Sequence, residues 1–300
     1  MKRPRLGLEV TSSCLRLAVI AGAGANAVAL VTRTKELPAG MIISQYAAPN
    51  VQDPDGFAAL LRDCLADAGY IAIRRAALSL PDSVFRVQTL EFDELPVKTA
   101  DRDKLVRWRL EKAAAFDIAD TVLRYQVLKR QDSGFTVLAC AAKQGVIRQY
   151  ESALTGAGLE PWSVGPSSFH ILQRYFNFIA DKTSATAAFA FISDDSLAMI
   201  VMEGGAVRFY RFKEIKKGGA EDAQARLMRE IEDSLHFYTH LDRSQETRIN
   251  RLFLGGDTAE LLGPLAEGLR SATSLEIEAL SLVGGTPMVF AAALGAGGAL

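Results

Sequence analysis

Apolar and polar positions form the same pattern twice along the chain, at residues 6–31 and again at residues 188–212. Each copy has three apolar runs of five or six residues, separated by short turns rich in Ser, Asp or Gly. Apolar runs bounded by such turns are typical of β-strands joined by hairpins. The pattern therefore predicts two three-stranded meanders that open the two halves of the chain and superpose on each other.

Segments with the apolar spacing of an α-helix follow each meander. Residues 54–69 place Phe57, Leu61 and Leu65 on one face before a glycine, and a short strand is predicted at 76–80. In the second half, a helix is predicted at 221–241, then a strand at 251–254 and a helix at 259–271. Strands that alternate with helices at this spacing indicate an α/β fold with mixed sheets.

An additional unit interrupts the first half at residues 84–160. Its predicted elements are a strand at 84–92, a helix at 99–116, a hairpin at 121–129 and 135–142, and a helix at 145–156. The helix at 99–116 is expected to bury Leu105, Val106 or Trp108, and Leu110 against the small sheet of the same unit. The predicted organisation is a first lobe at 1–83, the inserted unit at 84–160, a return to the first lobe with a linker helix at 161–184, and a second lobe at 185–300.

Composition and charge narrow the class of protein. The 34 Lys and Arg residues balance 35 Asp and Glu residues, so no overall field attracts nucleic acid or anionic lipid. No apolar run reaches the roughly 18 residues of a membrane span; residues 287–300 come nearest but are short and rich in Gly and Ala. Cys14, Cys64 and Cys140 lie far apart, as expected of free thiols in a reducing compartment. We therefore expect a cytoplasmic protein that reaches a membrane only through partners.

Several segments together carry the pattern of a known family. They lie at residues 6–19, 36–38, 77–81, 106–111, 124–128 and 229–238, the last (REIEDSLHFY) being followed by INRLFLGG at 249–256. In this order, and over nearly the whole chain, they resemble the family of the type IV pilus assembly protein PilM. The resemblance implies a two-lobed actin-like (ribonuclease H-like) fold with an inserted subdomain in the first lobe, as in the cell-division protein FtsA. It also implies an ATP cleft between the lobes and a scaffold role beneath the inner membrane.

Actin-like proteins hold the phosphates of ATP with two hairpin turns, where backbone N–H groups form an anion-binding nest beside an Asp that positions Mg²⁺. The resemblance places the first turn at Glu9-Val10-Thr11-Ser12-Ser13, followed by Arg16. The family pattern is Asp-Ile-Gly-Ser-Ser followed by Lys. The serines and a cation are therefore kept, whereas the Asp is Glu9 and the Gly is Thr11.

The other expected positions depart further from the family pattern. The second turn, expected as Asp-Ile-Gly, reads Phe191-Ile192-Ser193, with Asp194 and Asp195 following out of register; a third acidic position, expected in Asp-Val-Glu, reads Gly165-Pro166-Ser167. Only Gly255-Gly256, after a predicted strand, matches the glycine pair that lets a nucleoside approach the backbone. A plain turn is the alternative interpretation of that pair.

These departures predict a degenerate nucleotide site without catalytic residues. Each lost charged hydrogen bond is worth about 1.5–3 kcal/mol, so three losses approach the roughly 8 kcal/mol of a micromolar site. We expect ATP and Mg²⁺ to bind weakly or not at all, without efficient hydrolysis. The residues assigned to the degenerate site are Glu9, Thr11, Ser12, Ser13, Arg16, Ser193, Asp194, Gly255 and Gly256.

The resemblance also implies a partner. In PilM-like systems the partner is PilN, a single-span inner-membrane protein with a short, hydrophobic N-terminal tail in the cytoplasm. We expect the tail to dock in a groove between the first lobe and the inserted unit, near apolar positions at 84–95 and 135–138. Other proteins of a pilus or secretion platform are further candidate partners.

Three alternatives remain open at this point: a GspL-like cytoplasmic domain of type II secretion, a hydrolysing actin-like ATPase, and a small-molecule kinase of the same superfamily. GspL-like chains usually continue into a membrane span. A kinase needs a catalytic carboxylate that the sequence does not offer. Elsewhere, His236 and His240 lack a third metal ligand, and Lys213 to Lys217 are expected to form a solvated loop.

Overall fold

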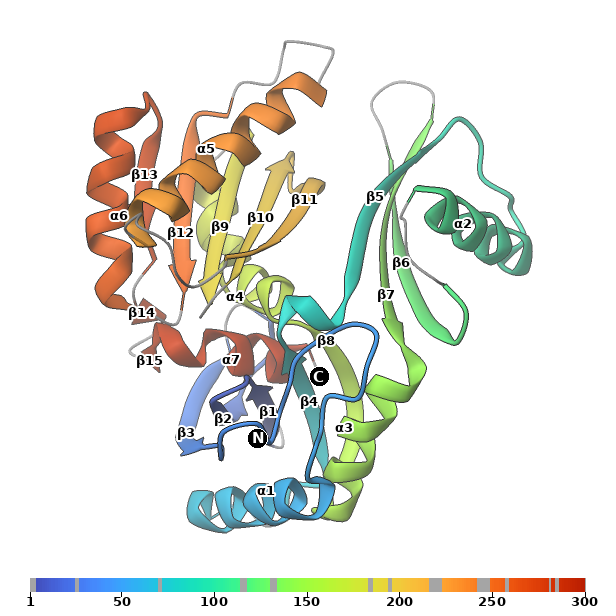
Figure 1. Ribbon diagram of the computed structural model, residues 1–300, viewed down its shortest axis with the longest axis vertical. Helices are drawn as coiled ribbons and strands as arrows, with labels where there is room; N and C mark the ends of the chain where they lie inside the picture. Colours follow the sequence, from blue (N-terminus) through green and yellow to red (C-terminus); the bar gives the residue numbers. More distant parts are fainter. Residues whose placement is uncertain are drawn as a thin grey trace.

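The structure is a computed structural model. It describes residues 4–24, 27–69, 72–113, 118–129, 134–182, 186–193, 196–215, 223–241, 249–256, 259–280, 282–283 and 286–299. Figure 1 shows two sheets surrounded by helices, with a third, smaller sheet beside them.

The first sheet has the strand order β3-β2-β1-β4-β8. Its antiparallel meander is β1 (Arg5–Val10), β2 (Cys14–Ala21) and β3 (Val28–Glu36). Two strands then add in parallel, β4 (Arg75–Leu80) beside β1 and β8 (Glu160–Pro166) beside β4.

The second sheet repeats this arrangement in the order β11-β10-β9-β12-β13. Its meander is β9 (Ala187–Ser193), β10 (Ser196–Glu203) and β11 (Ala206–Glu214), and its parallel strands are β12 (Arg251–Gly256) and β13 (Glu276–Ala279). The two meanders predicted from the repeated pattern are therefore confirmed, and each opens a five-stranded mixed sheet.

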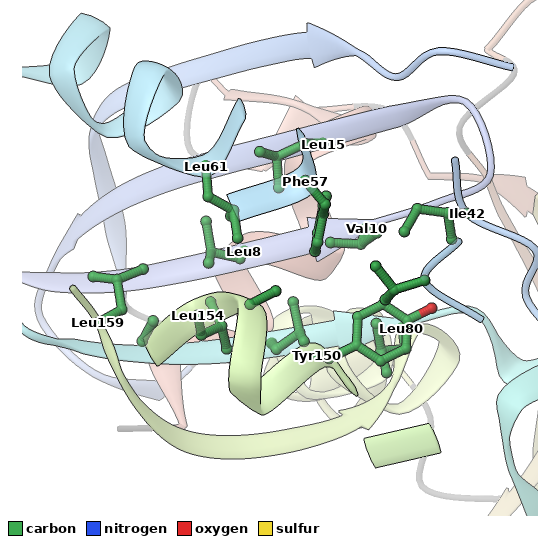
Figure 2. Close-up of a cluster of buried hydrophobic side chains, with 14 of the residues drawn as sticks. Leu8, Val10, Leu15, Ile42, Phe57, Leu61, Leu80, Tyr150, Leu154 and Leu159 are labelled. Atoms are coloured by element: carbon green, nitrogen blue, oxygen red, sulfur yellow. The ribbon is translucent and has the colours of Figure 1, made fainter. Parts of the chain in front are cut away.

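Helices α1 (Pro54–Ala68) and α3 (Gln144–Gly156) cover one face of the first sheet. The α1 helix begins where the Asp53 side chain accepts the Gly56 N–H at 3.0 Å, and it ends at Gly69 in a left-handed conformation. Phe57 of α1 and Tyr150 of α3 meet edge to face, with ring centroids 6.4 Å apart. Figure 2 shows Phe57 and Tyr150 in one cluster with the strand residues Leu8, Val10 and Leu80. The second sheet is covered in the same way by α5 (Ala223–Leu241) and α6 (Ala259–Ala272).

The opposite faces of the two sheets are covered by exchanged helices. Helix α4 (Ser167–Lys182), which comes after the first sheet in sequence, packs against the second sheet. Helix α7 (Ala291–Gly298), which ends the second half, packs against the first sheet and against α4. A Cβ at Gly7 would lie 1.8 Å from the Ala293 carbonyl oxygen, so β1 needs glycine where α7 crosses it. Before α7 come β14 (Leu282–Val283), β15 (Thr286–Pro287) and the short helix η3 (Met288–Phe290).

The Gly- and Ala-rich segment near residue 300 is thus an interior helix, because every residue of α7 is buried. Among the described residues, no helix is both long and apolar enough to cross a membrane.

The inserted unit leaves the first sheet through the short helix η2 (Asp82–Val84). It contains β5 (Arg86–Phe92), α2 (Thr99–Ala113), β6 (Thr121–Lys129) and β7 (Phe135–Lys143), with the strand order β5-β7-β6. Val106 and Leu110 of α2 are fully buried against this sheet, as predicted, whereas Trp108 on the other side of the helix is 52% exposed. Helix α3 corrects the expected extent of the unit. Its apolar face packs on α1 in the core of the first lobe, so the small sheet and its own core end at Lys143.

Candidate functional site

The turn between β1 and β2 satisfies its own backbone donors. The Thr11 hydroxyl oxygen accepts the N–H groups of Ser13 at 3.3 Å and Cys14 at 3.0 Å. The Thr11 N–H donates to the Cys14 carbonyl oxygen at 2.9 Å, while Ser12 and Ser13 remain exposed at the tip. Glycine at position 11 would leave the two inner N–H groups free for an anion, whereas threonine occupies them.

Glu9 and Arg16 form a buried ion pair beside this turn. One guanidinium nitrogen of Arg16 donates to a carboxylate oxygen of Glu9 at 3.0 Å, and the two side chains are 12% and 3% exposed. Both residues lie on facing positions of β1 and β2. The cation that the family pattern offers to phosphate therefore neutralises a neighbouring carboxylate.

The second-lobe residues lie on adjacent strands. Ser193 ends β9, and its carbonyl oxygen accepts the Ser196 hydroxyl at 3.0 Å. Phe191, in place of the expected Asp, is 4% exposed within the apolar cluster that β9, β10 and α4 share. Asp194, which was also assigned to the site, lies outside the described residues.

Gly255 and Gly256 are buried at the end of β12, paired with Phe191 and Ile192 of β9. A Cβ at Gly256 would lie 2.4 Å from the Ile192 carbonyl oxygen, and one at Gly255 would lie 2.8 Å from the end of the Met288 side chain. Close packing inside the second lobe is therefore a sufficient reason for both glycines. The structure brings Ser193 and these glycines together, and it gathers Glu9, Thr11, Ser12, Ser13 and Arg16 in the other sheet.

A buried polar cluster, not anticipated from the sequence, joins the two lobes. The Asp82 carboxylate accepts the Ser168 N–H at 3.0 Å and the Tyr210 hydroxyl at 2.8 Å, and the Ser168 hydroxyl also donates to it. Burial raises the pKa of the Asp82 carboxyl, although its three donors act in the opposite direction. Burial, together with the Asp82 carboxylate, raises the pKa of the Tyr210 hydroxyl well above its usual value.

The same cluster occupies the third position of the expected cleft. Ser167 starts α4, and its hydroxyl donates to the Leu80 carbonyl oxygen at 2.9 Å while accepting the Ser79 hydroxyl at 3.1 Å. Asp82, two residues after the end of β4, and the Ser-Ser pair at the start of α4 are weak signals of a helix cap. Nothing local indicated Tyr210, which lies in a different sheet from the strand that precedes Asp82.

The inserted unit contacts the first lobe through the segment that connects β3 to α1. The Ser83 hydroxyl donates to the Ser44 carbonyl oxygen at 3.1 Å, and the guanidinium of Arg86 lies 4.4 Å from the centre of the Tyr46 ring. Ile43, next to this contact, is an apolar side chain that is 47% exposed.

Two grooves flank the inserted unit on its other sides. One, of about 720 Å³, lies between β5 and β11. The other, of about 400 Å³, lies between the β6–β7 hairpin, α4 and the β10–β11 turn. Most apolar residues at 84–95 are buried in cores, although Phe85 and Val87 reach the first groove and Leu138 reaches the second.

The remaining candidates were the two histidines of α5, the short basic run and the cysteines. His236 and His240 stack with ring centres 6.5 Å apart, and no group of three metal-ligating side chains occurs among the described residues. Lys213 lies 3.7 Å from Glu230, while Lys216 and Lys217 fall outside the described residues. The three cysteines are free thiols, and burial raises the pKa of Cys64 to about 11.

Comparison with solved structures identifies the fold. The chain is similar to a protein of a "PilM-PilN type IV pilus biogenesis complex", with a TM-score of 0.80 and 20% identity over 99% of this chain and 98% of that one. It is also similar to a Bacteroides thetaiotaomicron protein with an actin-like ATPase fold, with a TM-score of 0.53 and 12% identity over 98% and 96% of the two chains. No protein-family model and no curated protein sequence matches.

A third structure connects the same fold to secretion. The cytoplasmic domain of EpsL, an inner-membrane component of the type II secretion system of Vibrio cholerae, matches with a TM-score of 0.52 and 11% identity over 97% of this chain and 93% of that domain. The expectation of a PilM-like, actin-like α/β fold is therefore confirmed.

Proposed function

We propose that this chain is an actin-like scaffold of a type IV pilus or related secretion platform. It docks the N-terminal cytoplasmic tail of a PilN-like, single-span inner-membrane protein, and its nucleotide site is degenerate. The observation that carries the proposal is the match over almost the full length of both chains to a protein from a PilM–PilN complex.

The junction between the first lobe and the inserted unit is the proposed docking region. It combines an exposed apolar side chain, Ile43, with a hydrogen-bonded contact between the β3–α1 segment and η2. A short apolar tail loses conformational entropy on docking, so a preformed site favours modest, roughly micromolar affinity. Repeated copies at a membrane raise the effective concentration, so such an affinity is sufficient in an assembly.

The contacts in the two turns support the proposal that the nucleotide site is degenerate. The Thr11 hydroxyl occupies the inner donors of the first turn, Arg16 is neutralised by Glu9, and Phe191 replaces the second carboxylate. A phosphate would have to displace an internal hydrogen bond or ion pair at each of the first two positions, which removes most of the gain from binding.

The test is co-purification. The chain is co-expressed with a PilN-like single-span protein from the same genome, either full length or lacking its cytoplasmic tail. We expect the full-length partner to co-purify and the truncated partner to be lost.

Two matched variants locate the contact. Ile43→Asp places a charge at the proposed region and should weaken capture, whereas Val28→Asp places the same charge at a similarly exposed position on β3 and should leave capture unchanged. The proposal is wrong if capture survives truncation of the tail. If capture requires the tail but ignores Ile43→Asp, the tail docks elsewhere.

The likeness to the EpsL domain favours a second candidate, a scaffold of a type II secretion platform. The lower TM-score makes it the weaker one. Release of phosphate from MgATP, tested alone and with a panel of sugars, would instead favour a hydrolysing ATPase or a kinase.

A further inference from the structure

The strands β5 and β11 are each the outermost strand of a sheet, and the two edges face each other. β5 borders the small sheet and β11 borders the second-lobe sheet. β11 contacts both β5 and η2, and Figure 1 shows β5 and β11 as the facing strands of two different sheets. The groove of about 720 Å³ lies between them.

The walls of this groove are consecutive strand residues. Residues 85–89 line one side and residues 209–214 line the other. Because each strand pairs with a sheet neighbour on one side only, the walls present main-chain N–H and C=O groups of two sheet edges. Such an edge can accept an extended peptide as an additional strand. At about 3.3 Å per residue, the lined length fits a segment of about five or six residues.

The groove carries a surplus of positive charge. Its lining contains Arg86, Arg211 and Lys213 against a single carboxylate, Glu214. Lys213 has a partner in Glu230 at 3.7 Å. The guanidinium groups of Arg86 and Arg211 instead lie over the rings of Tyr46, at 4.4 Å, and Phe237, at 5.1 Å. Within the described part of the chain, neither arginine has a carboxylate partner.

An apolar contact lies beside the cations. Phe237 of α5 lines the groove with 49% of its surface exposed, and it packs against Phe209 with ring centres 6.0 Å apart. Partly exposed aromatic and arginine side chains are the residue types that contribute most to protein–protein binding energy.

We propose that the β5–β11 groove binds an extended peptide segment in which acidic side chains alternate with apolar ones. The segment adds its backbone to a sheet edge, presents its carboxylates to Arg86 and Arg211, and places an apolar side chain against Phe237. This site goes beyond the proposed function, because it lies between the inserted unit and the second lobe and selects an acidic partner.

The first experiment uses a fluorescein-labelled octapeptide of alternating valine and glutamate, titrated with the full chain and followed by fluorescence anisotropy. We expect saturable binding that is at least about tenfold tighter than that of the same peptide with lysine in place of glutamate. N-methylation of all valines removes the N–H donors of one peptide edge, and N-methylation of all glutamates removes those of the other. At least one of these two peptides should bind about tenfold more weakly.

The second experiment changes the groove. Arg211→Glu should weaken the Val–Glu peptide at least about tenfold, as should Gln88→Glu, which tests the opposite wall if the first variant does not fold. Arg109→Glu makes the same charge change on an exposed position of α2 and should have no effect.

Several results would overturn the proposal: no binding up to about 1 mM, equal binding of both N-methylated peptides, or unchanged binding to a folded groove variant. Sedimentation velocity adds another. If the chain forms a dimer that Arg211→Glu dissociates, and if no peptide binds, the groove is occupied by a second copy of the chain.

Discussion

Glu9 and Phe191 occupy equivalent positions in the two lobes but meet opposite surroundings. In the first hairpin Val10 pairs with Leu15, and in the second Ile192 pairs with Leu197, so Glu9 and Phe191 each come one residue before these matching pairs. The preceding residue is Glu9 in one lobe, held by Arg16, and Phe191 in the other, held by an apolar cluster. Each position is satisfied inside its own lobe, so the repeated fold accommodates a carboxylate in one lobe and an aromatic ring in the other.

The two lobes also differ in the segment that comes after their central parallel strand. In the second lobe, β12 ends at Gly256 and α6 begins at Ala259. In the first lobe, η2 and the small sheet stand between β4 and α3. Since α3 covers its sheet as α6 covers the other, the insertion extends the lobe without replacing any part of it. The difference between the lobes is therefore an added surface, which is where partners are expected.

The largest expected effect comes from placing a carboxylate at position 191, as there is at position 9. Phe191→Asp places a carboxylate in the apolar cluster beneath α4, and a buried unpaired charge should destabilise the fold by about 3 kcal/mol or more. Phe191→Leu, which keeps the position apolar, should cost about 1 kcal/mol. Urea unfolding measures both. If Phe191→Asp and the wild type had the same free energy of unfolding, the side chain at position 191 would have to be open to solvent.

The second prediction concerns the helices that the lobes exchange. His170 of α4 is 9% exposed, and burial lowers its pKa to about 4. The unfolded chain takes up this proton near pH 6.5, so the contribution of His170 to stability is complete above that pH and is lost as the pH falls towards 4.

The resulting loss is about 2 kcal/mol by pH 5 and roughly 3 kcal/mol at pH 4. His170→Gln, which does not titrate, should lose less stability between pH 7 and pH 5, as measured by urea unfolding at both values. His236→Gln on the exposed side of α5 serves as the control. If His170→Gln loses as much stability as the wild type between pH 7 and pH 5, His170 is not the titrating group.

The third prediction tests the polar link between the lobes. Because the pKa of the folded Asp82 carboxyl is raised, its contribution to stability is present at low pH and is lost as the pH rises above about 4. The stability advantage of the wild type over Asp82→Asn should therefore shrink from acidic to neutral pH. Tyr210→Phe, which removes one donor, should cost about 1 kcal/mol. A constant difference between wild type and Asp82→Asn across this range would contradict the assignment.

The smallest expected effect is in the first turn. Thr11→Gly removes the side-chain cap and should cost about 1 kcal/mol, whereas Thr11→Ser should keep the cap. At about 1 mM, MgATP should stabilise the wild type by no more than a few tenths of a kcal/mol, as measured by its melting temperature. We expect MgATP to stabilise Thr11→Gly by little more than it stabilises the wild type, because Phe191 still replaces the second carboxylate. A dissociation constant below about 10 μM for the wild type would contradict the degenerate site.

Local patterns predicted the elements well. Pro54 and Gly69 marked the ends of α1, and the repeated apolar runs predicted both meanders. The period of α2 also separates Val106 and Leu110, which share a buried face, from Trp108, which lies two residues from each on the other side of the helix.

Contacts between distant segments could not be read from such patterns. The Tyr210–Asp82 hydrogen bond joins residues from different lobes, and the exchange of α4 and α7 depends on how both sheets pack. In the candidate site, the substitutions of Thr11 and Phe191 were visible in the sequence. Their consequences, a self-capped turn and a buried apolar contact, became clear only from the neighbours that each side chain meets.

We propose that this protein binds a partner tail in place of performing ATP chemistry. The most direct measurement is isothermal titration calorimetry of the purified chain with the cytoplasmic tail peptide of a PilN-like single-span protein from the same genome, with and without about 1 mM MgATP. We expect a dissociation constant in the micromolar range that ATP changes less than about twofold. Absence of tail binding, or tail binding that occurs only with MgATP, would contradict it.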